Sequence, residues 1–451
     1  MASTSPAELI QNSEFTTLPE VLKCVNPRHI DDLGTIAFLG WGKHFGPKTP
    51  FHVLNRLRQI GRGSNILLGL REGSSSIDEA EYFDFSTSSG NLVRVDEAVE
   101  EADTLVVSLP DSILLKNPDL FDKAKQGSLI VGLSGLLRVV GNGIDKFSGL
   151  NRINSGLFPK GLASRSMFPW TSIDPVDSFS RQAKLYTLAS LVGSPIVYNT
   201  SSAHEFRSDL LAEAGVLIGG SLALTSVYHD YIVDQTSDHA EAYYESILNL
   251  TGPIANQVKD YGFLGIYRSL DPEKQKIFRQ VYCASYPRLK HLAENIYQYL
   301  MSESGLDNLT HALMNNPDTL PDDLPGSKSY DRGEKKLCAI SDEPSTVLLA
   351  IYCALHMAQI NILKKHGHSW IEIISETEEA LDAHKRYKLS GLSDIYSSTA
   401  STFARMWQPH YEKIFRQLLS THFPVEDKQV FDDFTKNDFH NTFAKLKKIY
   451  T

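Results

Sequence analysis

The first part of the chain alternates short apolar runs with longer amphipathic stretches. Apolar runs that favour β-strands lie at residues 35–40, 65–70, 104–109, 128–133 and 194–199. Strands separated by crossover segments are typical of a parallel sheet with helices on its faces. We therefore expect an α/β domain of the Rossmann type over residues 1–200.

After residue 201 the strand signals stop and helical periodicity continues to the C-terminus. The predicted helices are 204–234, 240–258, 274–302, 344–366, 369–386 and 397–419. Lys364 and Lys365 followed by Gly367 are typical of a helix end, with cations at the negative end of the helix dipole and glycine in the left-handed cap. This pattern predicts an all-α domain over residues 201–451.

The helical domain shows a weak internal repeat. Two segments, 201–325 and 335–451, each have an apolar helix rich in small residues, a polar break and then a helix with acidic residues. A segment rich in proline, glycine and charge lies between them and predicts a loop. The apolar run 347–363 contains His356, Gln359 and Asn361, so we expect a buried core helix and no membrane span.

Composition narrows the class of protein. The 451 residues are 42% hydrophobic, enough for more than one core. Lys+Arg number 44 and Asp+Glu 54, giving a net charge of -10 without a basic tract, so we expect no nucleic-acid partner. The 4 cysteines lie far apart, which argues against a zinc site or a disulfide framework. The N-terminal residues lack targeting features, and we expect a cytoplasmic protein without a membrane partner.

A glycine-rich turn follows the first predicted strand. Gly40, Gly42 and Gly46 have the spacing of a dinucleotide fingerprint, G-x-G-x-x-G, lengthened by one residue. The segment is either a stretched cofactor loop or a glycine turn after a buried strand. Position after the first strand of an α/β domain favours the cofactor loop.

The segment after the second predicted strand bears on the choice of cofactor. It reads Arg-Glu-Gly-Ser-Ser-Ser, and Arg71, Ser74 and Ser76 offer a guanidinium and hydroxyl groups that suit the 2′-phosphate of NADPH. The alternative is a solvated loop. The third predicted strand ends near Pro110, where the carboxyl end of a strand faces the cofactor.

Asp209 and Glu213 lie four residues apart in a predicted helix with apolar neighbours. On an α-helix this spacing places both carboxylates on one face, where they repel. A divalent cation such as Mg²⁺ would relieve that repulsion, and two exposed acids on a solvated face are the alternative.

Motifs along most of the chain resemble ketol-acid reductoisomerase in its long, class II form found in plants. They are GWG at 40–42, GLREGSSS at 69–76, FPKG at 158–161, FRSDLLAE at 206–213, AYYESILNLTGPI at 242–254, MAQINILKKHGHSWIEIISE at 357–376, YSSTA at 396–400 and ARMW at 404–407. The resemblance implies a knotted, internally duplicated helical domain, NADPH as cofactor and two Mg²⁺ ions. It also implies an acetohydroxy-acid substrate that undergoes alkyl migration and then reduction. We expect a homodimer.

The resemblance implies roles for individual residues. Lys160 matches an active-site lysine, and Asp209 and Glu213 match metal-binding acids. Glu376 matches a carboxylate of a later acidic helix, and Ser397 matches a serine that contacts the substrate carboxylate. The expected cofactor contacts are Gly40, Trp41, Gly42, Gly46, Arg71, Ser74, Ser76, Pro110 and Ser134.

Departures from the family pattern cluster on the substrate side. A histidine expected after Ser134 is missing, and Ala380 stands where a second glutamate is expected, so that Glu379 is the nearest acid and a further metal candidate beside Glu376. Two-metal chemistry needs these groups more than hydride transfer does. We therefore expect an NADPH-dependent reductase of a cyclic 2-imino acid or a 2-oxo acid, similar to imine reductases that resemble this family. The alternatives are a true ketol-acid reductoisomerase and an inactive ligand-binding paralogue.

Overall fold

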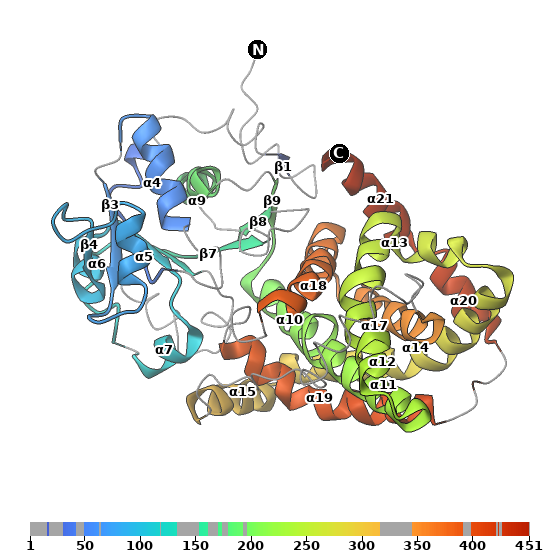
Figure 1. The fold of residues 1–451 in the computed structure, drawn as a ribbon. Coiled ribbons are helices and arrows are strands. Elements are labelled where there is room, and N and C mark those ends of the chain that lie inside the picture. Colours follow the sequence, from blue (N-terminus) through green and yellow to red (C-terminus); the bar gives the residue numbers. More distant parts are fainter. Residues whose placement is uncertain are drawn as a thin grey trace, which may run out of the picture. The chain divides into compact units, whose positions relative to one another are not determined.

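The computed structural model describes most of the chain in two compact units. The described residues are 16–17, 30–41, 49–62, 65–117, 119–132, 153–160, 170–173, 179–192, 196–315, 345–390, 398–420, 423 and 426–450. Contacts divide the chain into residues 1–206 and 207–451 (Figure 1). Each unit is described by itself.

The first unit is built on a nine-stranded sheet with the order β1-β9-β8-β7-β6-β5-β2-β3-β4. Its strands are β1 (Thr16–Thr17), β2 (Ile36–Leu39), β3 (Ile66–Leu70), β4 (Leu92–Arg94), β5 (Thr104–Val107), β6 (Leu129–Gly132), β7 (Ile153–Lys160), β8 (Trp170–Ile173) and β9 (Ile196–Asn199). Strands β4, β3, β2, β5, β6 and β7 pair with one another in the parallel sense. That order is the doubly wound order of dinucleotide-binding domains, which confirms the predicted α/β class.

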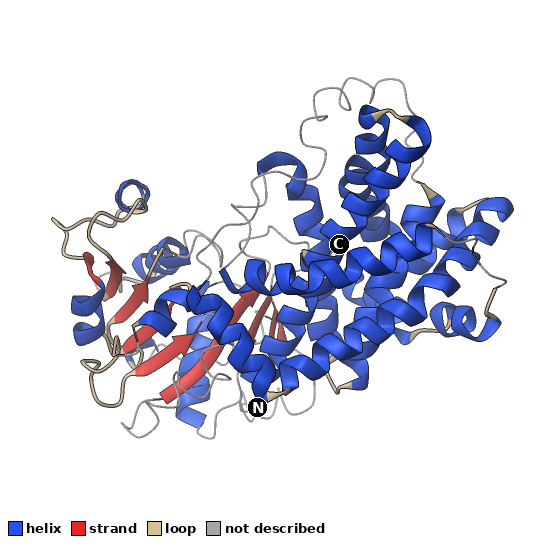
Figure 2. Ribbon diagram, turned by 90° about the horizontal axis from the view of Figure 1, so that it is seen from below, coloured by secondary structure: helices blue, strands red, loops and turns tan. Residues whose placement is uncertain are grey.

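Helices cover both faces of this sheet, which Figure 2 shows as the red layer. They are α4 (Thr49–Gln59), α5 (Ile77–Tyr82), α6 (Val95–Glu101), α7 (Asp111–Lys116) and α9 (Phe179–Val192). In β2, Ile36 and Phe38 belong to one apolar core, and Ala37 and Leu39 belong to another. Because successive side chains point to opposite faces, both faces of the strand are buried and the sequence shows a continuous apolar run.

The sequence missed four of the strands. β1, β4, β7 and β8 are short or carry glycine, proline and asparagine, so their apolar signal is weak. In β7, residues 153–156 pair with β6 and residues 157–160 pair with β8 in the antiparallel sense. Pro159 therefore lies in the half of the strand that pairs with only one neighbour, where its missing N–H breaks no ladder. The sheet is thus mixed. These weakly apolar strands form because neighbouring strands pair with them.

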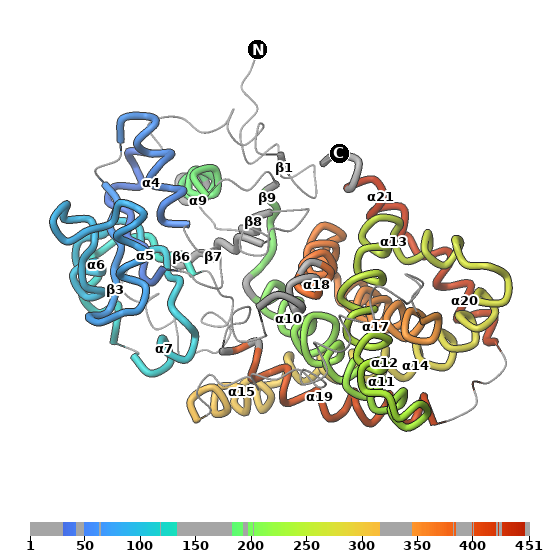
Figure 3. Tube along the Cα trace, viewed as in Figure 1, coloured from blue at the N-terminus to red at the C-terminus, as the bar shows by residue number. Residues whose placement is uncertain are grey.

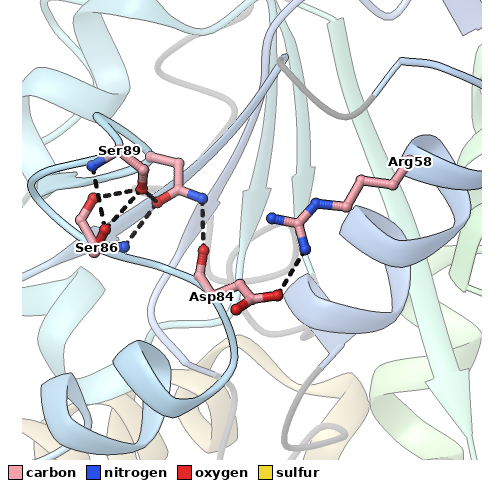
Figure 4. Close-up of polar contacts among 5 residues, drawn as sticks. Arg58, Asp84, Ser86 and Ser89 are labelled. Carbon is pink, nitrogen blue, oxygen red and sulfur yellow. Dashed lines mark hydrogen bonds and ion pairs between the residues drawn. The ribbon is translucent and has the colours of Figure 1, made fainter.

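A polar network lies at the amino ends of the strands, beside the start of β4 (Figure 4). Arg58 pairs with Asp84 at 2.7 Å, and Asn91 donates to the Asp84 carbonyl oxygen at 2.9 Å. Ser86 and Ser89 share a hydrogen bond of 2.8 Å, and Ser89 also donates to Asn91. The network joins the end of α4 to the loop before β4, at the edge opposite to the carboxyl ends of the strands.

The second unit is helical. Its elements are α10 (Ser202–Ala212), which begins in the first unit, η2 (Glu213–Leu217), α11 (Gly219–Thr236), α12 (His239–Tyr243), η3 (Tyr244–Leu248), η4 (Leu250–Ile254), α13 (Ala255–Ser269), α14 (Pro272–Met301), α15 (Glu303–Asn315), α17 (Thr346–Lys365), α18 (Trp370–Ser390), α19 (Ser398–Leu419), α20 (Lys428–Thr435) and α21 (Asp438–Tyr450). The predicted all-α class is confirmed. The described residues include several short helices that the sequence pattern did not predict.

Two predicted long helices are broken by π-helical turns, here labelled η. The predicted helix 204–234 changes to π geometry at Glu213 and returns to α geometry at Gly219. The predicted helix 240–258 contains η3 and η4, and Pro253 lies in η4. Apolar periodicity does not reveal the extra residue in such a turn, and π-turns frequently occur at functional sites.

The core of the second unit is formed by helices that are far apart in sequence. α14 packs along α17, and α11 packs along α19, drawn green and red-orange in Figure 3. Two helical stretches, Ala203–Thr236 and Thr346–Lys365, are long and apolar enough to cross a membrane, yet 94% and 83% of their apolar windows are buried inside the structure. The second stretch is therefore the buried core helix that the sequence predicts.

Gly219 is required where η2 ends. A methyl group on Gly219 would clash with the Ala214 carbonyl oxygen and lie 3.0 Å from that of Ala404 in α19, whereas a methyl group on Gly252 would meet nothing within 4 Å. We expect Gly219→Ala to lower the free energy of unfolding by about 1–3 kcal/mol, as overpacking does. Gly252→Ala is the control and should be neutral or slightly stabilising. Urea unfolding followed by circular dichroism tests this, and equal midpoints for both variants would contradict it.

Candidate functional site

The carboxyl ends of β2 and β5 meet at the point where the strand order reverses. Gly40 has φ +93°, which favours glycine, and a Cβ atom there would lie 3.1 Å from the Ser108 carbonyl oxygen. Ser108 donates from its backbone N–H to Leu39 at 3.0 Å and from its hydroxyl to Gly40 at 3.2 Å. Dinucleotides bind at this switch point in doubly wound sheets. The backbone at Gly40 fits a cofactor loop.

The other residues of the predicted glycine loop have different outcomes. Trp41 is 3% exposed and packs its ring against Phe83 and Phe85, both at 6.0 Å. Its indole is therefore part of the hydrophobic core, and only its backbone is left to contact a cofactor. Gly42, Gly46 and Ser134 lie outside the described residues.

The segment after β3 forms turns that lead into α5. Ser74 donates from its backbone to the Arg71 carbonyl oxygen at 3.1 Å, and Ser76 donates from its backbone to Ser74 Oγ at 3.3 Å. Arg71 is exposed, and both serines are half-buried. Pro110 is exposed and directly precedes α7 at the end of β5. These residues follow the carboxyl ends of β3 and β5, and their contact with a cofactor stays a prediction.

Arg94 is a further cation at this edge that the sequence reasoning missed. It is paired in register with Leu70, directly before Arg71, on the neighbouring parallel strand. Asp96 holds its guanidinium through two hydrogen bonds of 3.0 and 3.1 Å, and these bonds raise the pKa of Arg94. The only signal in the sequence was an arginine after a short apolar pair, which became informative once β4 was known to be a strand.

Three carboxylates meet in the second unit. Asp209 on α10 and Glu376 and Glu379 on α18 offer oxygen atoms that all lie within 4.8 Å of one another. Glu376 is 1% exposed, and Asp209 and Glu379 are half-buried. This group unites the first and later acidic segments of the sequence, and Glu379 takes part despite its i+3 spacing because residues three apart also share a helix face.

Glu213 directly follows α10 and begins η2, four residues after Asp209. It is 6% exposed, so it does not lie on a solvated face. Its role beside Asp209 stays a prediction.

A buried histidine supports η2 from α18. Burial lowers the pKa of His384 to about 4, and the ring interacts with the backbone carbonyl groups of Val216 and Leu217. The Tyr352 hydroxyl bonds to His384 Nδ1 at 2.8 Å. The ring is therefore neutral at pH 7 and accepts the tyrosine proton at Nδ1. This contact fixes the π-turn that follows Asp209.

The three-carboxylate group fits a hard divalent cation. Oxygen ligands of Mg²⁺ lie at about 2.1 Å from the ion, so that neighbouring ligand atoms are about 3 Å apart, and small side-chain rotations would bring the group to this geometry. Lys160 ends β7, but the structure describes only its backbone. Ser397 lies outside the described residues, directly before α19.

Three polar residues around this group were also missed. Ser208, Glu372 and His368 are buried. Ser208 Oγ lies within hydrogen-bond distance of Glu372 and Glu376, and His368 Nδ1 lies 3.1 Å from Glu372 Oε1. The sequence signal was the HGHSW segment, which carried the family resemblance without any role for its histidines.

Comparisons with known proteins agree with this arrangement. Residues 203–319 match the family described as ketol-acid reductoisomerase, C-terminal domain. The chloroplastic ketol-acid reductoisomerase of Pisum sativum is 26% identical over 441 residues, covering 89% of this chain and 73% of that protein. The mitochondrial enzyme of Saccharomyces cerevisiae is 22% identical over 279 residues, covering 58% of this chain and 67% of that protein.

Among solved structures, an NADH-preferring ketol-acid reductoisomerase from an uncultured archean matches with a TM-score of 0.47 and 14% identity, covering 75% of this chain and 97% of that one. The sequence matches reach both units, and the family match contains η2, η3 and η4 together with Asp209. Over most of its length the chain is therefore similar in sequence to ketol-acid reductoisomerases, and residues 203–319 are similar to their C-terminal domain.

Proposed function

We propose that this protein is an NADPH-dependent reductase that reduces the C=N bond of a cyclic 2-imino acid or the C=O bond of a 2-oxo acid without alkyl migration. The observation that carries this proposal is the compact group of Asp209, Glu376 and Glu379, whose oxygen atoms lie within 4.8 Å of one another. Such a group suits one cation. Polarising one C=O or C=N bond needs one Lewis acid, whereas alkyl migration in this family relies on two.

The chain's own residues have separate tasks in this proposal. Arg71, Ser74 and Ser76 bind the cofactor's 2′-phosphate, and the three carboxylates hold Mg²⁺. When bound, the cofactor would supply hydride and the cation would polarise the reacting bond. By the family resemblance, Lys160 donates a proton to the reduced group and Ser397 contacts the substrate carboxylate.

A true ketol-acid reductoisomerase is the second proposal. It is favoured by the presence of Glu379 in the three-carboxylate group. This acid can take the place of the glutamate that the family pattern has at the position of Ala380. The relatives in Pisum sativum and Saccharomyces cerevisiae carry that name. The two proposals differ in one measurable step, the migration.

We expect Arg71→Ala to weaken NADPH binding by roughly 10- to 150-fold and NADH binding far less, because a charge-assisted hydrogen bond contributes about 1.5–3 kcal/mol. Arg94→Ala should act in the same direction with a smaller effect, since Arg94 lies one strand away. Arg58→Ala is the matched control, because Arg58 is an exposed, acid-paired arginine at the opposite edge. Fluorescence titration measures both cofactors. Equal losses for NADPH and NADH would contradict the phosphate assignment.

We expect Glu379→Gln and Asp209→Asn each to weaken Mg²⁺ binding about tenfold or more, because ligand charge sets the affinity of a site for a hard cation. Isothermal titration calorimetry of the full chain measures this directly. Glu303→Gln, an exposed glutamate on α15, is the control and should bind Mg²⁺ as the wild type does. Unchanged binding in both site variants would place the cation elsewhere.

Substrate choice separates the two proposals. The wild type with NADPH and Mg²⁺ should oxidise NADPH with a cyclic 2-imino acid or with 3-hydroxy-3-methyl-2-oxobutanoate, because these substrates need only hydride. It should leave 2-acetolactate unchanged, because that compound must first rearrange. Product analysis by mass spectrometry accompanies the NADPH assay. Turnover of 2-acetolactate to the dihydroxy acid would establish the reductoisomerase and overturn the first proposal.

A further inference from the structure

A chain of buried polar contacts runs through the second unit and ends on Glu376. The Tyr297 hydroxyl bonds to His368 Nε2 at 2.8 Å, and His368 Nδ1 lies 3.1 Å from Glu372 Oε1. Ser208 Oγ lies 3.1 Å from the same Glu372 oxygen and 3.3 Å from Glu376 Oε1. The side chains of His368 and Glu372 are 0% and 2% exposed. Three elements, α14, α10 and the start of α18, are joined in this way.

The direction of the hydrogen bond between Tyr297 and His368 follows from the protonation of the phenol. Burial raises the pKa of Tyr297 to about 12, so the phenol keeps its proton, and Arg207 donates to the phenol oxygen. The phenol therefore donates to His368 Nε2. His368 Nδ1 lies 3.1 Å from Glu372 Oε1, without the alignment of a hydrogen bond.

The HGHSW segment builds this arrangement locally. Gly367 has φ +86°, and the backbone N–H of His368 closes the end of α17 by donating to Leu363 at 3.1 Å. This turn brings two histidine rings to Tyr297, because His366 stacks on the phenol ring at 4.0 Å while His368 bonds to its hydroxyl. The glycine cap thus fixes the position of His368 relative to α14.

We propose that His368, Glu372 and Ser208 are positioning residues that orient Glu376 as a cation ligand. The inference rests on the cation site of the proposed function. Ser208 has one hydroxyl hydrogen, and its Oγ lies 3.1 Å from Glu372 Oε1 and 3.3 Å from Glu376 Oε1. Shared between these two oxygens, the hydrogen holds Glu376 Oε1 and leaves Oε2 to bind the cation, while His368 lies against the same Glu372 oxygen.

Without Ser208, two buried carboxylates would face each other with no hydrogen between them. Repulsion would turn Glu376 away from the geometry that it needs with Asp209 and Glu379. Removing a residue that hydrogen-bonds to a metal ligand typically lowers the metal affinity by about 10- to 100-fold. The positioning role therefore predicts a loss of Mg²⁺ affinity at residues that do not touch the ion.

The experiment is calorimetric Mg²⁺ titration of the full chain, without cofactor or substrate, together with thermal unfolding. Ser208→Ala and His368→Leu should each weaken Mg²⁺ by roughly 10- to 100-fold. His368→Asn should restore most of the affinity, because its amide N–H replaces Nδ1–H toward Glu372. Ser285→Ala is the matched control, since Ser285 is a fully buried serine whose hydroxyl bonds only a helix carbonyl group at 2.7 Å among the described contacts.

Rescue by His368→Asn and normal affinity in Ser285→Ala would support the positioning role over a general loss of packing. Wild-type affinity in Ser208→Ala, or in His368→Leu if Ser208→Ala does not fold, would overturn the inference and leave the cation site standing. Equal losses in Ser285→Ala and Ser208→Ala would also overturn it. Absence of Mg²⁺ binding by the wild type would overturn the cation site itself and the inference with it.

Discussion

Repulsion between buried carboxylates is the constraint on which the helical unit depends. Asp209, Glu376 and Glu379 bring oxygen atoms within 4.8 Å of one another. Two like charges 4 Å apart repel by about 4 kcal/mol at an effective dielectric constant of 20. A protein that keeps such a group in its fold needs a counter-charge or hydrogen-bond donors there. A divalent cation would supply the counter-charge. The polar contacts that run from Tyr297 to Ser208 supply a hydrogen-bond donor.

The sequence predicted those parts of the fold in which a single strand or helix carries its own signal. β2, β3, β5, β6 and β9 are apolar on both faces and were visible, and α14, α17 and α19 begin and end close to their predicted limits. β7 and β8 were not visible, because Asn154, Gly156 and Pro159 disfavour a strand in β7 and because β8 has only 4 residues. They form where neighbouring strands supply the hydrogen bonds, and this information lies in tertiary pairing.

The same limit explains the outcome at the acidic site. Spacing on an ideal α-helix predicted a pair of Asp209 and Glu213, which stays a prediction, and suggested that Glu379 was out of place. The i+3 position of Glu379 keeps its carboxylate beside that of Glu376. Small packing glycines cause no change in apolar periodicity, so the turn at Gly219 was invisible. Ser208 carries no spacing signal, because it meets Glu372 and Glu376 only when α10 and α18 are packed together, whereas His368 and Glu372 lie four residues apart.

The central claim is that the three-carboxylate group binds a divalent cation, and crystals of the protein soaked with Mn²⁺ test it most directly. Mn²⁺ takes the oxygen ligands that suit Mg²⁺ and scatters anomalously. The account predicts an anomalous peak about 2.2 Å from carboxylate oxygens of Asp209, Glu376 and Glu379, a distance slightly longer than that for Mg²⁺. A fully soaked crystal with no peak at this group, or with its peak at other residues, would contradict the account.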